Sequence, residues 1–234
     1  MNNVTRIRMR VLALFLPIAA VLYIGGEAVS PKGTDTVLDT MATALRVVPV
    51  ARQHPAQLYL ASSLVLFGLG ALAVSYGAIA LLVRERGATL ATIAALAGGL
   101  GAFCGAIANV FAYPVLAATA SAPVSAGSAA KVLVTAANSR FVETFEGLYF
   151  ATEFLAPLLM GIALWRSRAV PRWLAVLFFA GLEVAEQMGS YGPIVVLFML
   201  PFAAAMVLLA VRIWRAAAVP ASERPVVKPA IVPV

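Results

Sequence analysis

The chain has one cysteine, one histidine and few charged residues, and each shortage excludes a class of protein. Only 12% of its 234 residues are charged, about half of the ~25% usual in a soluble domain, whereas 62% are hydrophobic and the mean hydropathy is +0.96. A soluble globule of this size cannot bury so many apolar side chains, because its interior is too small. The composition therefore excludes an ordinary soluble enzyme, a disordered chain and a nucleic-acid-binding domain, and it predicts a polytopic membrane protein.

The rarity of cysteine and histidine also limits the chemistry available to the chain. Cys104 cannot form a disulfide within the chain, and we expect it to pack as a small hydrophobic residue in its apolar surroundings. A single histidine excludes a bis-histidine haem or a multi-histidine zinc site, and the chain lacks a phosphate-binding glycine loop and a CxxC pair. We therefore expect no cofactor and no bound metal. His54 precedes Pro55, which is typical of a loop residue before a helix; a pH-sensing role is the alternative.

Long apolar stretches dominate the rest of the sequence. A helix needs ~20 apolar residues to cross a ~30 Å hydrocarbon core. Six stretches meet this requirement, at residues 11–29, 58–83, 89–113, 141–165, 170–188 and 193–214. They predict an all-α membrane bundle of six transmembrane helices over residues 1–216. Residues 217–234 contain four prolines and are predicted to form a disordered cytoplasmic tail.

Basic residues are distributed unevenly between the predicted loops. With the N-terminus in the cytoplasm, 12 of the 17 Lys and Arg residues lie on the cytoplasmic side and 5 on the outer side. This asymmetry follows the positive-inside rule and predicts that both termini are cytoplasmic, which requires an even number of spans. The preference for Arg over Lys, 14 against 3, is typical of a GC-rich bacterial genome. We therefore expect a multi-pass protein of a bacterial cytoplasmic membrane, with the lipid bilayer as a partner and no nucleic acid.

The predicted inner turn between the fourth and fifth spans runs from Trp165 to Ala175 and reads WRSRAVPRWLA. This stretch resembles the tight inner turn of a broad group of uncharacterised bacterial six-helix membrane proteins. These proteins share long outer connections after the first and third spans and short inner turns. The resemblance covers the second to sixth spans; it implies the same topology and no particular activity.

Two connections on the predicted outer side are long enough to contain helices of their own. In the first, Thr34 is expected to cap a short amphipathic helix that lies on the membrane surface or caps the bundle. In the second, residues 129–137 are expected to form a similar helix. Within the third span, Gly101 and Gly105 have the small-xxx-small spacing of close helix contacts. We therefore expect this span at the centre of the bundle, packed against the second span.

Acidic residues inside the predicted spans are the main indication of function, because a carboxylate in lipid is energetically costly. Six of the ten acidic residues lie within or at the ends of spans: Glu27, Glu143, Glu146, Glu153, Glu183 and Glu186. Glu153 is twelve residues from either end of its span, or ~18 Å, which places it near the midplane of the bilayer. Glu146 lies on the same side of the helix, ~10 Å nearer the outside.

These acidic residues, with two nearby amides, predict an acidic pocket that opens to the outside. The predicted ligand or cation pocket consists of Glu27, Asn109, Glu146, Glu153, Glu183, Glu186 and Gln187. The alternative for each carboxylate is an interfacial position or a structural hydrogen bond between helices.

Three functions could use such a pocket. The first is transport of a small solute or cation, coupled to protons, since carboxylates one helical turn apart suit a hard cation. The second is an enzyme, a cyclase or isomerase, in which Glu153 or Glu183 is the general acid on a lipophilic, terpenoid-like substrate and nearby aromatic residues stabilise a carbocation. These aromatic residues are Phe145, Tyr149, Phe150 and Phe154. The third is an accessory subunit that binds a membrane-protein partner. We favour transport or an accessory role over the enzyme.

Overall fold

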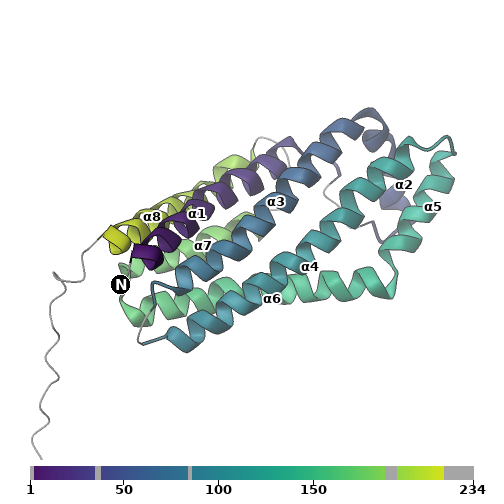
Figure 1. Ribbon diagram of the computed structural model, residues 1–234. Coiled ribbons are helices and arrows are strands. Elements are labelled where there is room, and N and C mark those ends of the chain that lie inside the picture. The colour runs from purple at the N-terminus through teal and green to yellow at the C-terminus, as the bar shows by residue number, and fades with distance from the viewer. Residues whose placement is uncertain (1–2, 35–37, 84–85, 188–193, 219–234) are drawn as a thin grey trace, which may run out of the picture.

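The structure is a computed structural model that describes residues 3–34, 38–83, 86–187 and 194–218 (Figure 1). Within these ranges the protein is all-helical, as the long apolar stretches predict, and no described residue forms a strand. Its helices are α1 (Asn3–Val29), α2 (Met41–Gln53), α3 (Pro55–Ala80), α4 (Ala88–Ser121), α5 (Ala126–Ala137), α6 (Arg140–Ser167), α7 (Arg172–Gln187) and α8 (Val195–Ala218).

Five of these helices, α1, α3, α4, α6 and α8, are long and apolar enough to cross a membrane. This confirms the prediction of a protein with several membrane-spanning helices. The fifth of the six predicted spans corresponds to α7, which has 16 described residues and a length of ~24 Å, short of the ~20 residues that a crossing needs. Its predicted last residue, Met188, lies outside the described residues.

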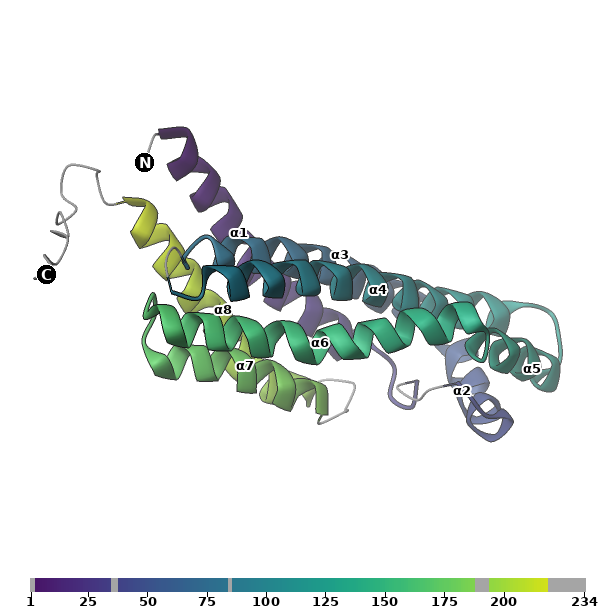
Figure 2. The same ribbon diagram turned by 90° about the horizontal axis from the view of Figure 1, so that it is seen from below.

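The six helices α1, α3, α4, α6, α7 and α8 pack side by side in a closed ring, in which each helix contacts the next and α8 returns to α1 (Figures 1 and 2). The α3–α4 and α6–α7 turns lie at the same end of the ring as the start of α1 and the end of α8 (Figure 2). We expected α4 at the centre of the bundle; instead it is one member of the ring, between α3 and α6.

Large apolar side chains fill most of the interior of the ring. Leu16, Met160, Phe178, Phe202 and Leu209 are completely buried there. Lipid is as apolar as these side chains, so close packing between helices, rather than escape from water, holds such a core together.

Two short helices and the last turns of α4 form a separate cap at the other end of the ring (Figure 2). Helix α4 continues through Pro114 to Ser121, eight residues past its predicted end, so its 34 residues extend ~51 Å and exceed the ~30 Å hydrocarbon core. The buried side chains of the cap come from α2, from the start of α3, from the last turns of α4 and from α5: Ala44, Val47, Val48, Ala51, Leu58, Tyr113, Leu116, Ala117, Ala120, Ala129, Ala130 and Leu133. The amphipathic helix α2 therefore packs on other helices of the protein.

The structure corrects the predicted start of α2. We expected Thr34 to cap this helix, but its hydroxyl donates instead to the Pro31 carbonyl oxygen, at 2.7 Å. The N-cap of α2 is Thr40, whose side-chain oxygen accepts from the Thr43 amide at 3.3 Å. The second predicted helix is confirmed as α5, which begins three residues earlier than expected, after its N-cap Ser125.

Arg52 fastens α2 to the end of α4. Its Nε donates to the Ala120 carbonyl oxygen at 2.8 Å, and its Nη2 donates to the Val124 carbonyl oxygen at 2.6 Å. The last carbonyls of a helix have no partner within the helix and carry partial negative charge, which a guanidinium neutralises.

The last helix extends beyond the predicted boundary between bundle and tail. Helix α8 continues to Ala218, and Ala217 is completely buried against the bundle. The first two residues of the predicted tail are therefore helical, whereas residues 219–234 lie outside the described residues.

Candidate functional site

A small cavity, here called the ring cavity, lies inside the ring of helices and contains Glu153. It encloses about 30 Å³, which is room for a water molecule or a small ion. Side chains from five helices line it: Tyr23, Leu69, Leu72, Tyr76, Gly98, Gly101, Ala102, Tyr149, Thr152, Glu153, Ala156 and Leu182. Glu153 is the one acidic residue among these lining residues, and its side chain is half-buried.

Glu153 belongs to a hydrogen-bonded series of side chains. The Tyr149 hydroxyl donates to Glu153 Oε1 at 2.5 Å, and the Tyr149 and Tyr23 hydroxyl oxygens lie 3.5 Å apart. Glu153 is 13 residues after the first residue of α6 and 14 before the last, so the series lies near the middle of a membrane-length helix. A carboxylate at this depth needs polar partners, and a tyrosine hydroxyl is one that a membrane bundle can supply.

The glycines of α4 make space for this series. A Cβ atom added to Gly101 would lie 2.6 Å from Thr152 Oγ1, and one added to Gly105 would lie 2.7 Å from the Tyr149 ring. Both glycines therefore face α6, and Gly105 also meets α3, since a Cβ atom there would lie 3.3 Å from Leu69 Cδ1. The expected packing of this span against the second span, α3, is confirmed. A third glycine of α4, Gly98, also faces α3, since a Cβ atom there would meet the Tyr76 ring at 2.4 Å.

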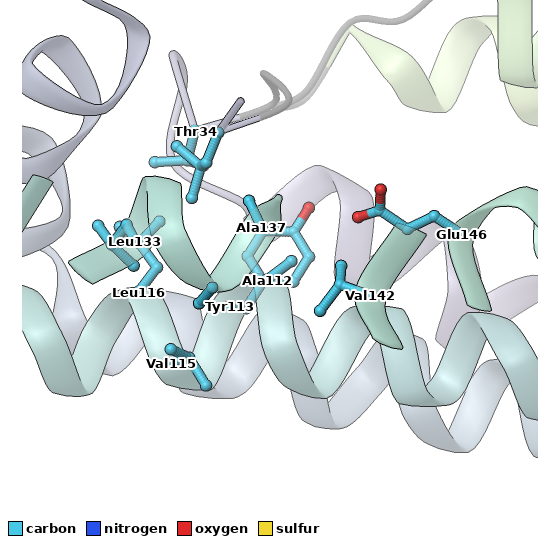
Figure 3. A pocket seen from close by; sticks show the side chains of 11 residues that line it. Thr34, Ala112, Tyr113, Val115, Leu116, Leu133, Ala137, Val142 and Glu146 are labelled. Atoms are coloured by element: carbon cyan, nitrogen blue, oxygen red, sulfur yellow. The ribbon is translucent and has the colours of Figure 1, made fainter. Parts of the chain in front are cut away.

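A second cavity, here called the cap cavity, lies between the cap and the start of α6 (Figure 3). It encloses about 80 Å³. Most of its lining is apolar, from α4, α5 and α6, and its polar side chains are Thr34, Tyr113 and Glu146. The half-buried Glu146 lies at one end, beside Val142, with Thr34 and Leu133 toward the other end (Figure 3). Such a site suits a small cation that also carries an apolar group, because one carboxylate faces an otherwise apolar surface.

The structure therefore places Glu146 and Glu153 on two cavities that share no lining residue, rather than in one continuous pocket. Both residues are on the same face of α6, as predicted from their spacing of seven. Tyr149 lies between them on that face, and its ring packs against the position of Gly105.

Asn109, Glu27 and Glu183, also predicted for the pocket, are not among the lining residues of these two cavities. Asn109 is buried between α3 and α4, where its Nδ2 donates to the Ser62 carbonyl oxygen at 3.0 Å and to the Ser62 hydroxyl at 3.2 Å. Glu27 is half-buried near the end of α1. Glu183 is half-buried on α7, directly after Leu182 of the ring cavity. Asn109 thus joins two helices of the ring.

Three predicted residues contribute little to the description of the site. Glu186 and Gln187 are in the last turn of α7, and their side chains lie outside the described part of the chain. His54 is exposed; it ends α2 and precedes α3, and its side chain forms no capping hydrogen bond. Among the residues that the structure describes, no three His, Cys, Asp or Glu side chains form a group that could hold a metal ion.

The aromatic residues predicted to stabilise a carbocation do not gather around Glu153. Phe150 and Phe154 have exposed fractions of 60% and 52%, so they lie on the outer surface of the ring. Phe145 packs on Phe141, with ring centroids 4.8 Å apart. Of the four, only Tyr149 lines the ring cavity.

Of the three tyrosines that line the ring cavity, sequence reasoning missed Tyr23 and Tyr76. Tyr149 is four residues before Glu153, so helical spacing is enough to find it. Tyr23 and Tyr76 come from other helices, and an isolated tyrosine in an apolar span carries no signal of such a contact.

Comparison with protein-family models, with curated protein sequences and with solved structures finds no match to this chain. The class of the protein therefore follows from its own features: it is all-helical, and several of its helices are long and apolar enough for a multi-pass membrane protein. The likeness of the Trp165–Ala175 turn to bacterial six-helix proteins stays a prediction.

Proposed function

We propose that this protein is a proton-coupled carrier of a small cation or other small solute, and that Glu153 is the group that binds the proton. The series Tyr23–Tyr149–Glu153 inside the ring of helices is the observation on which this proposal rests. A hydroxyl group both donates and accepts, so the two tyrosines can pass a proton toward the carboxylate. Intramembrane carboxylates with such partners are typical of proton relays in pumps and transporters.

The topology in this proposal has six crossings and two cytoplasmic termini, in a bacterial cytoplasmic membrane. Helix α7 serves as the sixth crossing in this proposal, because it packs between α6 and α8, two helices long and apolar enough to cross a membrane. The support for the orientation is the excess of arginines at the end of the ring where α1 starts and α8 ends.

The size of the ring cavity favours a proton or a small ion over a lipophilic substrate at Glu153. About 30 Å³ accommodates a water molecule, and a terpenoid would require the ring to open. No comparable observation favours the cyclase or isomerase, because Phe150 and Phe154 face away from Glu153. In this proposal the cap cavity, with Glu146, is where the transported species first binds.

The proposal is tested with purified protein in liposomes that contain a pH-sensitive dye. A pH gradient is imposed, and Na⁺, K⁺, Mg²⁺ and small organic amines are added one at a time. We expect at least one of these to accelerate dissipation of the gradient by wild-type protein. Glu153→Gln should reduce this rate at least tenfold, because glutamine binds no proton.

Asp39→Asn is the control, because it removes an exposed carboxylate that lines neither cavity. It should transport at the wild-type rate. A Glu153→Gln variant that is folded and fully active would overturn the role of Glu153. A folded wild-type protein that dissipates no gradient with any of these solutes would overturn transport and would favour the accessory role.

A further inference from the structure

An apolar groove runs along the outside of the ring between α6 and α7. It encloses about 360 Å³, and its walls are Leu158, Gly161 and Ile162 from α6 and Ala175, Val176 and Phe179 from α7. The groove exists because Gly161 and Ala175 are small: a Cβ atom at Gly161 would already lie 3.3 Å from Phe179 Cβ. Ile162 and Val176 have exposed fractions of 40% and 50%, so the groove opens away from the ring interior.

The groove ends at a cluster of basic and aromatic residues. Trp165 forms its last wall, and the guanidinium of Arg172 stacks on the Trp165 ring at 5.1 Å from its centroid. Arg166 and Arg168 belong to the same turn and are exposed. The sequence from Phe154 to Leu182 contains no acidic residue. One end of an apolar groove thus carries three positive charges and a tryptophan.

We propose that this groove binds an anionic phospholipid, with an acyl chain along the groove and the lipid phosphate between Arg166, Arg168 and Arg172. Guanidinium groups bind phosphate with paired, charge-assisted hydrogen bonds. Basic clusters where helices leave the bilayer recognise anionic headgroups, and tryptophan is enriched at this level. From Leu158 to Trp165 the groove rises over seven residues, or ~10 Å, so its apolar part lies at the depth of the acyl chains.

The charge distribution favours a lipid over a second copy of the chain. A symmetric contact through this groove would bring six arginines together without a carboxylate from either α6–α7 turn, and like charges repel. A phospholipid supplies both the apolar chain and the negative charge in one molecule.

The test is lipid titration of the delipidated full-length protein in a non-ionic detergent, read by native mass spectrometry and by the unfolding temperature. Phosphatidylglycerol and phosphatidylcholine with identical acyl chains are compared. We expect about tenfold tighter binding of phosphatidylglycerol. The triple variant Arg166→Gln, Arg168→Gln, Arg172→Gln should reduce this preference to within about twofold. Arg8→Gln, exposed on α1 at the same end of the bundle, should retain it.

Two further measurements separate the groove from the headgroup contacts. Val176→Trp fills the groove and should weaken the binding of both lipids at least fivefold, while the ratio of the two affinities stays the same. Glycerol 1-phosphate, a headgroup without chains, should not compete. If the triple variant does not fold, Arg172→Gln and Arg172→Lys replace it, and glutamine should reduce the preference more than lysine, which keeps the positive charge but loses the paired hydrogen bonds.

Three results would overturn the proposal. These are equal affinities of the wild type for the two lipids, an unchanged affinity in Val176→Trp, and competition by glycerol 1-phosphate, which would indicate a site for a soluble phosphate.

Discussion

At the residue scale, the contact between Tyr149 and Glu153 stabilises a carboxylate in the middle of α6. Tyr149→Phe removes the hydroxyl that donates to Glu153 Oε1 at 2.5 Å and leaves the ring in place. Leaving a buried acceptor without its hydrogen-bond donor costs about 1–3 kcal/mol, so we expect the free energy of unfolding to fall by about that amount. Thermal unfolding in detergent at neutral pH measures the change.

Tyr59→Phe is the control for this variant, because Tyr59 has an exposed fraction of 45%. It should leave the unfolding temperature unchanged. Equal unfolding temperatures for Tyr149→Phe and the wild type would show that the Tyr149 hydroxyl does not stabilise Glu153.

The sequence predicts the depth of a residue better than its partners. Counting residues from the span ends places Glu153 near the middle of its helix, and the structure agrees. The contact between Tyr23 and Tyr149 joins residues 126 apart, and that between Asn109 and Ser62 joins residues 47 apart. Neither pairing leaves a pattern in one sequence, because it depends on which helices are neighbours and how each is rotated.

At the scale of elements, the glycines of α4 determine how closely it approaches α6. Gly101→Ala adds a Cβ atom 2.6 Å from Thr152 Oγ1 and 3.2 Å from Thr152 Cβ, so one of the helices must shift. Overpacking of this kind costs about 1–3 kcal/mol, and we expect the free energy of unfolding to fall by that amount. Unfolding in detergent measures it.

Gly99→Ala provides a control of opposite sign on the same helix. A Cβ atom at Gly99 has no neighbour within 4 Å, and alanine favours the helix over glycine by about 0.5–1 kcal/mol. This variant should therefore be slightly more stable than the wild type. A Gly101→Ala variant that is equally stabilised would show that α4 and α6 are not in close contact at Thr152.

The middles of the long helices could be predicted, and so could some ends, such as the end of α1 at Val29, whereas the end of α4 could not. Apolar windows report where a helix is inside the bilayer, so they give no signal for the turns beyond it. Helix α4 continues past Pro114 because Leu116, Ala117 and Ala120 are buried in the cap against α2 and α5. These contacts outweigh the helix-breaking tendency of Pro114, and they exist only in the folded protein.

At the scale of the whole molecule, the six ring helices lie side by side in the order in which they follow one another along the chain, and α8 closes the ring on α1. The position of each acidic residue along its helix could be estimated from the sequence. The direction in which its side chain points, relative to the neighbouring helices, could not. For this reason the single predicted pocket corresponds to two cavities, one with Glu146 and one with Glu153. Closure of the ring also places the start of α1 beside the end of α8, and this bears directly on topology.

In the proposed topology the two ends of the ring lie on opposite sides of a membrane, which cysteine labelling can test. In a Cys104→Ala background, Ser128→Cys puts a thiol on the exposed side of α5 in the cap, and Ser167→Cys puts one at the α6–α7 turn. An impermeant maleimide applied to intact bacterial cells should label position 128 and not position 167. Permeabilised cells should show labelling at both positions, which controls for access. Labelling of position 167 in intact cells would reverse the orientation inferred from the arginines, and labelling of both positions would show that α6 does not cross the membrane.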